Sequence, residues 1–200
     1  MGLDLSLTAI PKEGTTILEK AKRRQNSEYS TIIFSLHRAF DTNFNDFGHS
    51  EWIEFKKDAQ NLAKHYPNKK FENKYYLDTN RTYEVFDYLI AKKLHPNRNF
   101  KETPPFFYDG ILCDFSQSGQ GHYLMLWDYK IIQKKNDILN RFDFEQYYEM
   151  YNLQNMLDEG VYKIHQIAAN TQELKSIFNQ IKKFLKNALE LEGYVIVFKI

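Results

Sequence analysis

The sequence predicts an α+β fold, with a small mixed or antiparallel sheet packed with several helices and a long C-terminal helix followed by a terminal strand. Three observations predict this class. Apolar and polar residues alternate near the N-terminus, which is the period of a half-buried strand. Apolar residues recur at helical spacing in several later segments. Strand and helix signals do not alternate regularly, so a parallel βαβ architecture is not expected.

The first expected element is a strand over residues 2–10, where leucine and alanine alternate with polar residues. A proline and a glycine then interrupt the pattern. Three helices are expected next: residues 15–24, 29–40 and 51–66. The second of these segments is ambiguous between helix and strand, and the spacing of its apolar residues favours a helix. Ser50 is expected to cap the third helix, and Pro67 stops it.

Another helix is expected over residues 81–94, with Asp78 as its candidate N-cap. Its apolar residues recur at helical spacing, and two lysines in the last turn suit the negative end of a helix dipole. Residues 95–105 are rich in proline and asparagine, so they are expected to form a loop.

Two short strands are expected around a Ser/Gly loop. The apolar runs "GILCDF" at 110–115 and "HYLMLW" at 122–127 flank the residues "SQSGQG". Asp128 is then expected to cap a helix whose apolar stripe ends at Phe142. The loop itself is the most unusual polar segment of the chain, and it is therefore the first place to look for a functional site.

The C-terminal third predicts two helices and a strand. An aromatic and methionine-rich helix is expected over residues 143–157, with Gly160 in the left-handed position after it. Residues 161–167 alternate and are a candidate strand. Asn170 is expected to cap the longest helix. The final strand is expected over residues 194–200.

Length and composition predict a single α+β domain over residues 1–200, with about 26–75 as a candidate helical insertion. The chain has 27 basic and 26 acidic residues, a net charge of +1, and no basic excess of the kind that nucleic-acid binders use. Cys113 is the one cysteine, which excludes an internal disulfide and fits a reducing compartment. No apolar run is long enough to span a membrane, and no secretory signal pattern is present. We expect a cytoplasmic protein that binds neither nucleic acid nor membrane.

The C-terminal half resembles a known family. The segments "HYLMLWDYKIIQKKNDILNRFD" and "ELKSIFNQIKKFLKNALELEGYVIVFKI" follow its order of loop, strand, helices and closing strand. The opening "MGLDLSLTAI" and the segment "LDTNRTYEVFDYLI" are also similar to it, although Tyr83 and Asp87 stand where that family tends to have tryptophan and histidine. These patterns resemble the YfbM-like proteins, small bacterial proteins of unknown function. The resemblance implies an α+β fold in a bacterial protein and carries no activity with it.

Nucleophilic catalysis is one possible role of the Ser/Gly loop. Ser118 lacks the flanking glycines of a nucleophile elbow, although His122 is close enough in sequence to act as a base. The loop also lacks the glycine and lysine spacing of both nucleotide-binding fingerprints. The alternative is that serine and glycine supply turn flexibility between two strands.

Metal and cofactor sites are not predicted. The six histidines are scattered, and no two of them lie two to four residues apart. A set assembled across the fold from His122, Asp114 and either His165 or Asp87 stays open, against the alternative of ordinary solvated histidines. The aromatic residues likewise leave two readings open, a partner surface or a core built from large rings.

The preferred functional hypothesis is a bacterial protein-binding module, with an immunity- or antitoxin-like role as one concrete form. The alternative is a small hydrolase-like enzyme with a polar cluster around the Ser/Gly loop, so whether the chain is an enzyme stays open. An enzyme should show these polar side chains converging in a pocket, whereas a binding module should show an exposed apolar patch. The candidate binding residues are Tyr83, Asp87, Asp114, Ser118, His122, Tyr123 and Trp127.

Overall fold

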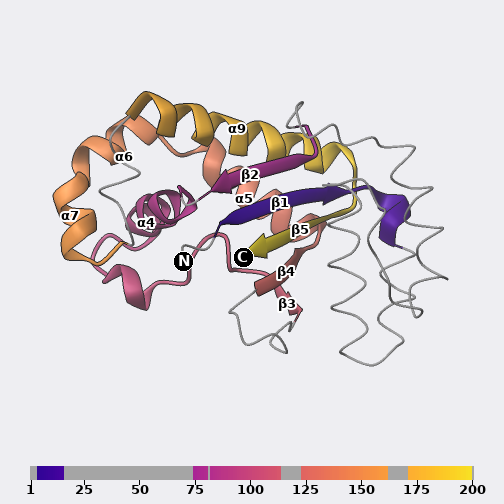
Figure 1. Ribbon diagram of the computed structural model, residues 1–200, viewed down its shortest axis with the longest axis horizontal. Coiled ribbons are helices and arrows are strands. Elements are labelled where there is room, and N and C mark those ends of the chain that lie inside the picture. Colours follow the sequence, from indigo (N-terminus) through magenta and orange to yellow (C-terminus); the bar gives the residue numbers. More distant parts are fainter. Residues whose placement is uncertain (1–3, 16–73, 81, 114–122, 162–170, 200) are drawn as a thin grey trace.

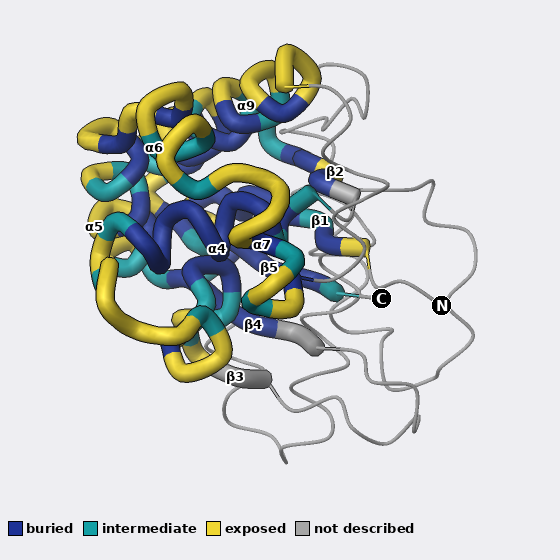
Figure 2. Tube along the Cα trace, turned by 90° about the vertical axis from the view of Figure 1, so that its left-hand side faces the viewer, coloured by how far each residue is buried: buried dark blue, intermediate teal, exposed yellow. Residues whose placement is uncertain are grey.

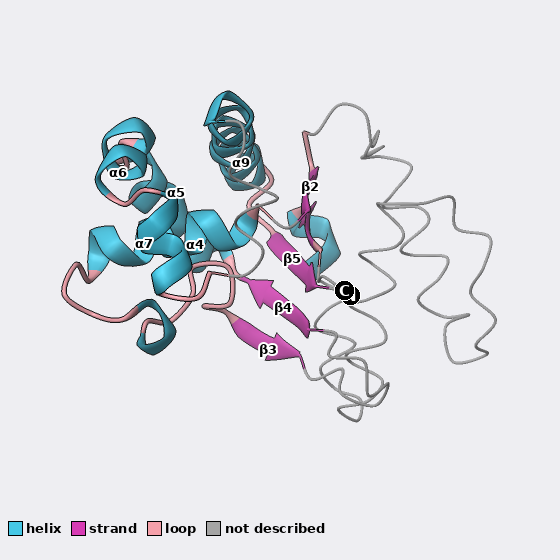
Figure 3. Ribbon diagram, turned by 60° about the vertical axis from the view of Figure 1, so that its left-hand side comes forward, coloured by secondary structure: helices cyan, strands magenta, loops and turns pink. Residues whose placement is uncertain are grey.

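The computed structural model describes residues 4–15, 74–80, 82–113, 123–161 and 171–199. Within these residues, five strands form one antiparallel sheet, and the helices gather on one of its faces (Figures 1 and 3). The long helix precedes the terminal strand, as the sequence predicts. The α+β class is therefore confirmed, and the antiparallel form of the sheet is the correct one of the two that the sequence left open.

The sheet has the strand order β2-β1-β5-β4-β3. The strands are β1 Leu5–Ile10, β2 Tyr76–Asn80, β3 Ile111–Cys113, β4 Tyr123–Trp127 and β5 Tyr194–Lys199. β1 pairs with β5 along its whole length, from Leu5 opposite Lys199 to Ile10 opposite Tyr194. The first and last described strands are thus neighbours near the middle of the sheet.

The helices on the sheet are α4 Tyr83–Leu94, α5 Tyr129–Asn140, α6 Phe144–Met150, α7 Leu153–Asp158 and α9 Thr171–Glu190. Two short 3₁₀ turns, η1 Lys12–Gly14 and η3 Phe100–Glu102, complete the described elements. α4 is buried on almost every side, as its tube in Figure 2 shows, because it lies between the sheet and the other helices. α9 presents the predicted apolar stripe to the core and charged residues to solvent.

Large rings fill the core between helices and sheet. Phe86, Phe144 and Phe178 come from three helices, and their ring centroids lie 5.4–6.1 Å apart. Most of the aromatic side chains of the described segments pack in this way, so core packing accounts for them better than a partner surface does.

Several predicted elements are confirmed by the structure. Asp128 caps α5 by accepting a hydrogen bond from the Ile131 N–H at 2.8 Å. The strands on either side of the Ser/Gly loop pair antiparallel. Gly160 adopts the left-handed conformation after α7, with φ of 77°. After α9, the other left-handed residue is Glu192, with φ of 50°, and Gly193 follows it.

Asp78 is not an N-cap. It lies within β2, the edge strand that pairs with β1, and α4 begins only at Tyr83. The Thr79 hydroxyl donates to the Leu5 carbonyl at 3.0 Å, which fixes this polar segment to the sheet. The strand was missed because its sequence, "YLDTN", shows little apolar alternation, and pairing with a neighbouring strand outweighs weak local propensity.

The helix predicted over residues 143–157 is two helices, α6 and α7, with separate caps. Asp143 caps the first, accepting from the Gln146 N–H at 3.1 Å. Asn152 forms a capping box with Asn155 and starts the second. The chain therefore turns between the two helices at Asn152, a polar cap residue within the aromatic run from which one helix was predicted.

Other predictions fall outside the described residues. These are the helices over 15–24, 29–40 and 51–66, apart from Thr15, with the cap of Ser50, the strand over 161–167 beyond Val161, and the cap of Asn170.

Candidate functional site

Four of the seven candidate binding residues lie in described segments, two on α4 and two on β4. Tyr83 and Asp87 occupy the first two turns of α4, and Tyr123 and Trp127 begin and end β4. The other three, Asp114, Ser118 and His122, lie outside the described residues.

β3 ends at Cys113 and β4 begins at Tyr123, both at one end of the sheet. Tyr123, which follows the loop, lies opposite Lys199 at the end of β5. The Lys199 ammonium lies 4.8 Å from the ring centroid of Tyr108 and 5.4 Å from that of Tyr83. The fold thus brings Tyr83 close to the end of the sheet at which β4 begins.

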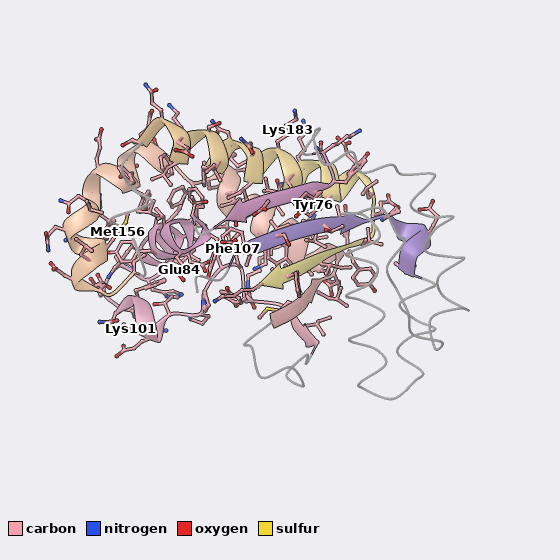
Figure 4. All side chains as sticks on the ribbon, viewed as in Figure 1. Tyr76, Glu84, Lys101, Phe107, Met156 and Lys183 are labelled. Carbon is pink, nitrogen blue, oxygen red and sulfur yellow. The ribbon has the colours of Figure 1, made fainter. Side chains whose placement is uncertain are left out.

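Asp87 is buried, with 2 % of its surface exposed. One carboxylate oxygen accepts a hydrogen bond from the Phe107 N–H at 3.0 Å, which ties α4 to a segment that lies between that helix and the sheet (Figure 4). Burial raises the pKa of Asp87 to about 7, although the Phe107 N–H and the charge of Lys135 oppose the rise. Asp87 is therefore held near its protonation midpoint at neutral pH.

Lys135 on α5 is a buried cation that the sequence analysis did not single out. Its ammonium donates to the Phe106 carbonyl and lies 4.5 Å and 4.6 Å from the ring centroids of Phe106 and Trp127. Burial lowers the pKa of Lys135 to about 8, against the opposing charges of Asp109 and Asp87. Its spacing was the available signal, since position 135 is three residues after Ile132 and four before Leu139 on the apolar stripe.

Tyr83 and Trp127 are core residues, with 1 % and 0 % of their surfaces exposed. The Trp127 ring stacks on Phe107 with centroids 6.2 Å apart, and Tyr83 meets Phe107 edge to face at the same separation. Burial raises the pKa of Tyr83. These two rings support the site from within and do not offer a contact surface to a partner.

The exposed concave feature near these buried groups is a groove between α4 and α5. Two adjoining pockets of about 250 Å³ and 590 Å³ share Leu94, Lys134 and Ile138 in their walls. We call their joint lining the α4–α5 groove. Its residues are Ile90, Ala91, Lys93, Leu94, His95, Pro104, Pro105, Phe106, Asp109, Lys130, Gln133, Lys134, Lys135, Asp137, Ile138 and Arg141.

The groove combines an aliphatic floor with a basic rim. Leu94 is 46 % exposed, and Ile138 is half-buried beside it. Five of the lining side chains are cationic and two are anionic, so the lining carries +3 with histidine neutral, of which one charge belongs to the buried Lys135. The whole chain carries +1, and the remainder therefore carries −2. Positive charge is concentrated at this surface although the composition is balanced.

An internal ion pair fixes the wall of the groove that follows α4. The Lys92 ammonium lies 2.6 Å from a Glu159 carboxylate oxygen and also donates to the Arg98 carbonyl at 3.0 Å. The other Glu159 oxygen accepts from the Phe100 N–H at 2.9 Å. Burial alone raises the pKa of Glu159, but these hydrogen bonds outweigh burial and hold it below its usual value. The segment that leads to Pro104 and Pro105 is thereby anchored to α4 and α7.

Two negative findings apply to the described parts of the chain. No three histidine, cysteine, aspartate or glutamate side chains of these parts come together as metal ligands. No helix there has the length and the apolar character that crossing a membrane requires.

Comparison with known proteins gives a family and a fold. A family model described as a domain of unknown function, DUF1877, matches residues 32–198. Among solved structures, the crystal structure of YfbM from Escherichia coli, a protein of unknown function, is similar with a TM-score of 0.50 and 10 % sequence identity. The alignment covers 98 % of this chain and 99 % of that one. No curated protein matches the chain.

Proposed function

Because the chain belongs to the DUF1877 family of proteins of unknown function, as the YfbM-like resemblance predicted, we propose a function from its surface: it is a protein-binding module that holds a partner in the α4–α5 groove. The observation that carries this proposal is the exposed aliphatic floor of that groove, framed by charged side chains. Protein interfaces commonly have this anatomy, with an apolar centre and a polar rim. An immunity- or antitoxin-like role in the bacterial cytoplasm is the concrete form that we propose.

The architecture around the groove supports a preformed site. Leu94 ends α4, Ile138 belongs to α5, and the Lys92–Glu159 pair anchors the segment that forms the third wall. Rigid elements hold a binding surface in place before the partner arrives, which lowers the entropic cost of association.

Site-specific photocrosslinking in the native host tests the proposal. A photoreactive phenylalanine analogue replaces Leu94 in the groove, and a matched variant carries it at Leu153 on α7, which is 38 % exposed and outside the groove. We expect a discrete protein adduct from position 94 that is absent from position 153. The adduct should be lost when Arg141→Glu is added. Identical adducts from the two positions, or none from position 94, would contradict the proposal.

The immunity-like form has a separate test. The crosslinked partner is expressed alone and together with the chain, and growth of the host is measured. We expect the wild-type chain to relieve toxicity of the partner, and Leu94→Asp to fail although it remains folded by circular dichroism. A partner that is harmless when expressed alone would rule out this form and leave the binding function in place.

One observation favours a hydrolase-like enzyme as a second candidate. The Ser/Gly loop precedes β4 in the sequence; β4 begins opposite Lys199, whose ammonium lies 5.4 Å from the ring centroid of Tyr83, and the buried Asp87 follows Tyr83 on α4. Perturbed carboxyl pKa values are frequent at active sites. Hydrolysis of short-chain p-nitrophenyl esters tests it, with Ser118→Ala compared with the matched Ser116→Ala. An activity that Ser118→Ala and His122→Ala abolish and Ser116→Ala retains would support the enzyme, and no activity above buffer would eliminate it for this class.

A further inference from the structure

We infer that the partner segment held in the α4–α5 groove is acidic and carries an apolar anchor side chain. This inference rests on the proposed function, and it adds the chemical class of the partner. Three properties of the groove lead to it: the largely apolar pocket, the excess of cations around that pocket, and the smaller number of acidic side chains to compensate them.

The anchor pocket is the smaller of the two cavities, with a volume of about 250 Å³. Its walls include Ile90, Leu94, Pro104 and Ile138. A cavity of this lining takes an aliphatic or aromatic side chain, because burying apolar surface on both sides contributes about 25 cal/mol per Å². Interfaces generally concentrate their binding energy in such anchored side chains. The partner therefore needs one large apolar residue at this point.

The charged side chains around the second cavity favour acidic residues on either side of the partner's apolar anchor. Lys130 and Arg141 lie at opposite ends of α5, and neither forms an ion pair with another described side chain. Lys134 is partly compensated, since its ammonium lies 3.2 Å from an Asp109 carboxylate oxygen. Two exposed cations without carboxylate partners on the described surface are positioned to meet carboxylates from another chain.

Lys93 shows that the positive charges in the groove repel one another. Its ammonium donates to the carbonyl of Arg141 and lies over the rings of Phe142 and Tyr147 at 5.3 Å and 5.7 Å. Burial and then the Arg141 charge lower the pKa of Lys93, against the opposing charge of Asp143. A carboxylate placed between these two cations would relieve the repulsion. Acidic residues on the partner are thus favoured by direct attraction and by this relief.

A nucleic-acid strand is the competing polyanion, and the groove fits it less well. Sites for single strands combine cations with exposed aromatic rings on which bases stack. The exposed floor here is aliphatic, and Phe106, the aromatic side chain in the lining, is buried. The net charge of +1 also gives little of the counterion-release affinity that nucleic-acid binders use. The groove chemistry therefore favours an acidic peptide.

Fluorescence anisotropy with defined synthetic peptides tests the inference. The first probe is a short peptide with glutamates around a central leucine. The second replaces every glutamate with glutamine, and the third replaces the leucine with serine. A labelled single-stranded oligothymidine is the polyanion control. We expect the first peptide to bind at least about tenfold more tightly than the other two, a difference of about 1.4 kcal/mol. Its affinity should fall as salt is added.

Matched variants locate the binding surface. Arg141→Glu and Lys130→Glu reverse charges on the rim of the groove, whereas Lys183→Glu and Lys186→Glu reverse exposed charges on α9 (Lys183 is labelled in Figure 4). We expect each groove variant to weaken the acidic peptide about five- to tenfold and each α9 variant to leave it within twofold. Equal effects from both pairs would show a diffuse charge effect and would overturn the inference.

The outcomes separate this inference from the proposed function. If the crosslink at position 94 forms but the glutamine peptide binds as well as the glutamate peptide, the acidic class is wrong and the binding function stands. If oligothymidine binds as tightly as the acidic peptide and the groove variants weaken both, the surface is a general anion site and the inference fails. If no crosslink forms at position 94 and no peptide binds, both proposals fail.

Discussion

Asp87 and Lys135 show what burial does to single charged side chains in this molecule. Both lie in the core near Phe106 and Phe107, and burial displaces both pKa values toward neutrality, one from below and one from above. Sequence reasoning identified Asp87 through a family resemblance. It missed Lys135, because the neighbours of that residue are polar and its place on the apolar stripe of α5 was not weighed. A buried charged side chain such as Lys135 can be predicted only when the charge of the residue and its position on an apolar helix stripe are considered together.

Asp87→Asn is expected to stabilise the protein above about pH 7. The pKa of Asp87 is about 7 in the folded state and near 3.8 in the unfolded state, so between these values the folded state binds more protons. The free energy of unfolding attributable to this group therefore falls as pH rises from about 4 to 7. Asparagine removes the ionisation and can still accept from the Phe107 N–H. We expect a gain of about 1–3 kcal/mol near pH 8 and little change near pH 4.5.

Urea denaturation at the two pH values measures this difference, with Glu149→Gln on α6 as the matched control. Glu149 is exposed, so its substitution should have a small effect at both pH values. A stabilisation of Asp87→Asn that is the same at both pH values would show that the substitution acts through packing, and the ionisation argument would then be wrong.

At the scale of elements, local polar residues determine where helices begin. Pairing with a distant strand determines where β2 forms, and local residues do not indicate it. The cap of α5 is read directly from Asp128 in the sequence, and the next helix was predicted to begin at residue 143, where Asp143 caps α6 in the structure. The separate cap at Asn152 was hidden within an aromatic run, so two helices were predicted as one. β2 could not be predicted from its own residues, since its partner β1 lies about 70 positions away in the sequence. Long-range pairing has no local signature.

Asp128→Ala is expected to destabilise the protein by about 1 kcal/mol. The substitution removes the acceptor for the Ile131 N–H at the start of α5, the helix that carries one side of the groove. Thermal or urea unfolding measures the loss, and Asp137→Ala is the control on the exposed face of the same helix. The control should change stability by less than about 0.5 kcal/mol. Equal losses in the two variants would mean that the cap contributes nothing specific.

The α4–α5 groove was not predicted from the sequence, because it forms only when separate segments pack together. Its lining comes from α4, α5 and the segment between η3 and β3, and these residues are spread over positions 90–141 of the sequence. The charges that give it +3 are distributed among acidic residues in the chain and come together only after folding. The sequence supplied the fold class and the expectation of an apolar patch, whereas the position of the patch depends on how the elements pack.

At the scale of the whole molecule, Gly193 holds the N-terminal and C-terminal elements together. A Cβ at this position would lie 1.9 Å from the carbonyl oxygen of Ile10 and 2.6 Å from the carbonyl carbon of Pro11. Both atoms belong to the backbone at the end of β1, so neither can rotate away. Glycine is needed here because of this close approach. It is not needed for a left-handed backbone, because the left-handed residue at this turn is Glu192.

Gly193→Ala is therefore expected to cost at least about 2–3 kcal/mol of unfolding free energy, as backbone displacement at a packed site does. Urea unfolding measures it, and Glu190→Ala is the control three residues earlier on the exposed face of α9. A loss below about 0.5 kcal/mol would show that the β1 end shifts freely, and the pairing of β1 with β5 would then be less rigid than its register indicates.

The pairing of β1 with β5 also has a consequence for how the polypeptide is made. Residues 5–10 are synthesised well before residues 194–199, the segment with which they pair. The sheet cannot gain this central pair until residues 194–199 have been made, so an apolar strand stays without that partner until then. Contacts between segments so distant in sequence also slow folding, because a large loop must close before they form. We therefore expect the nascent chain to depend on chaperones, and truncated chains that end before β5 to aggregate.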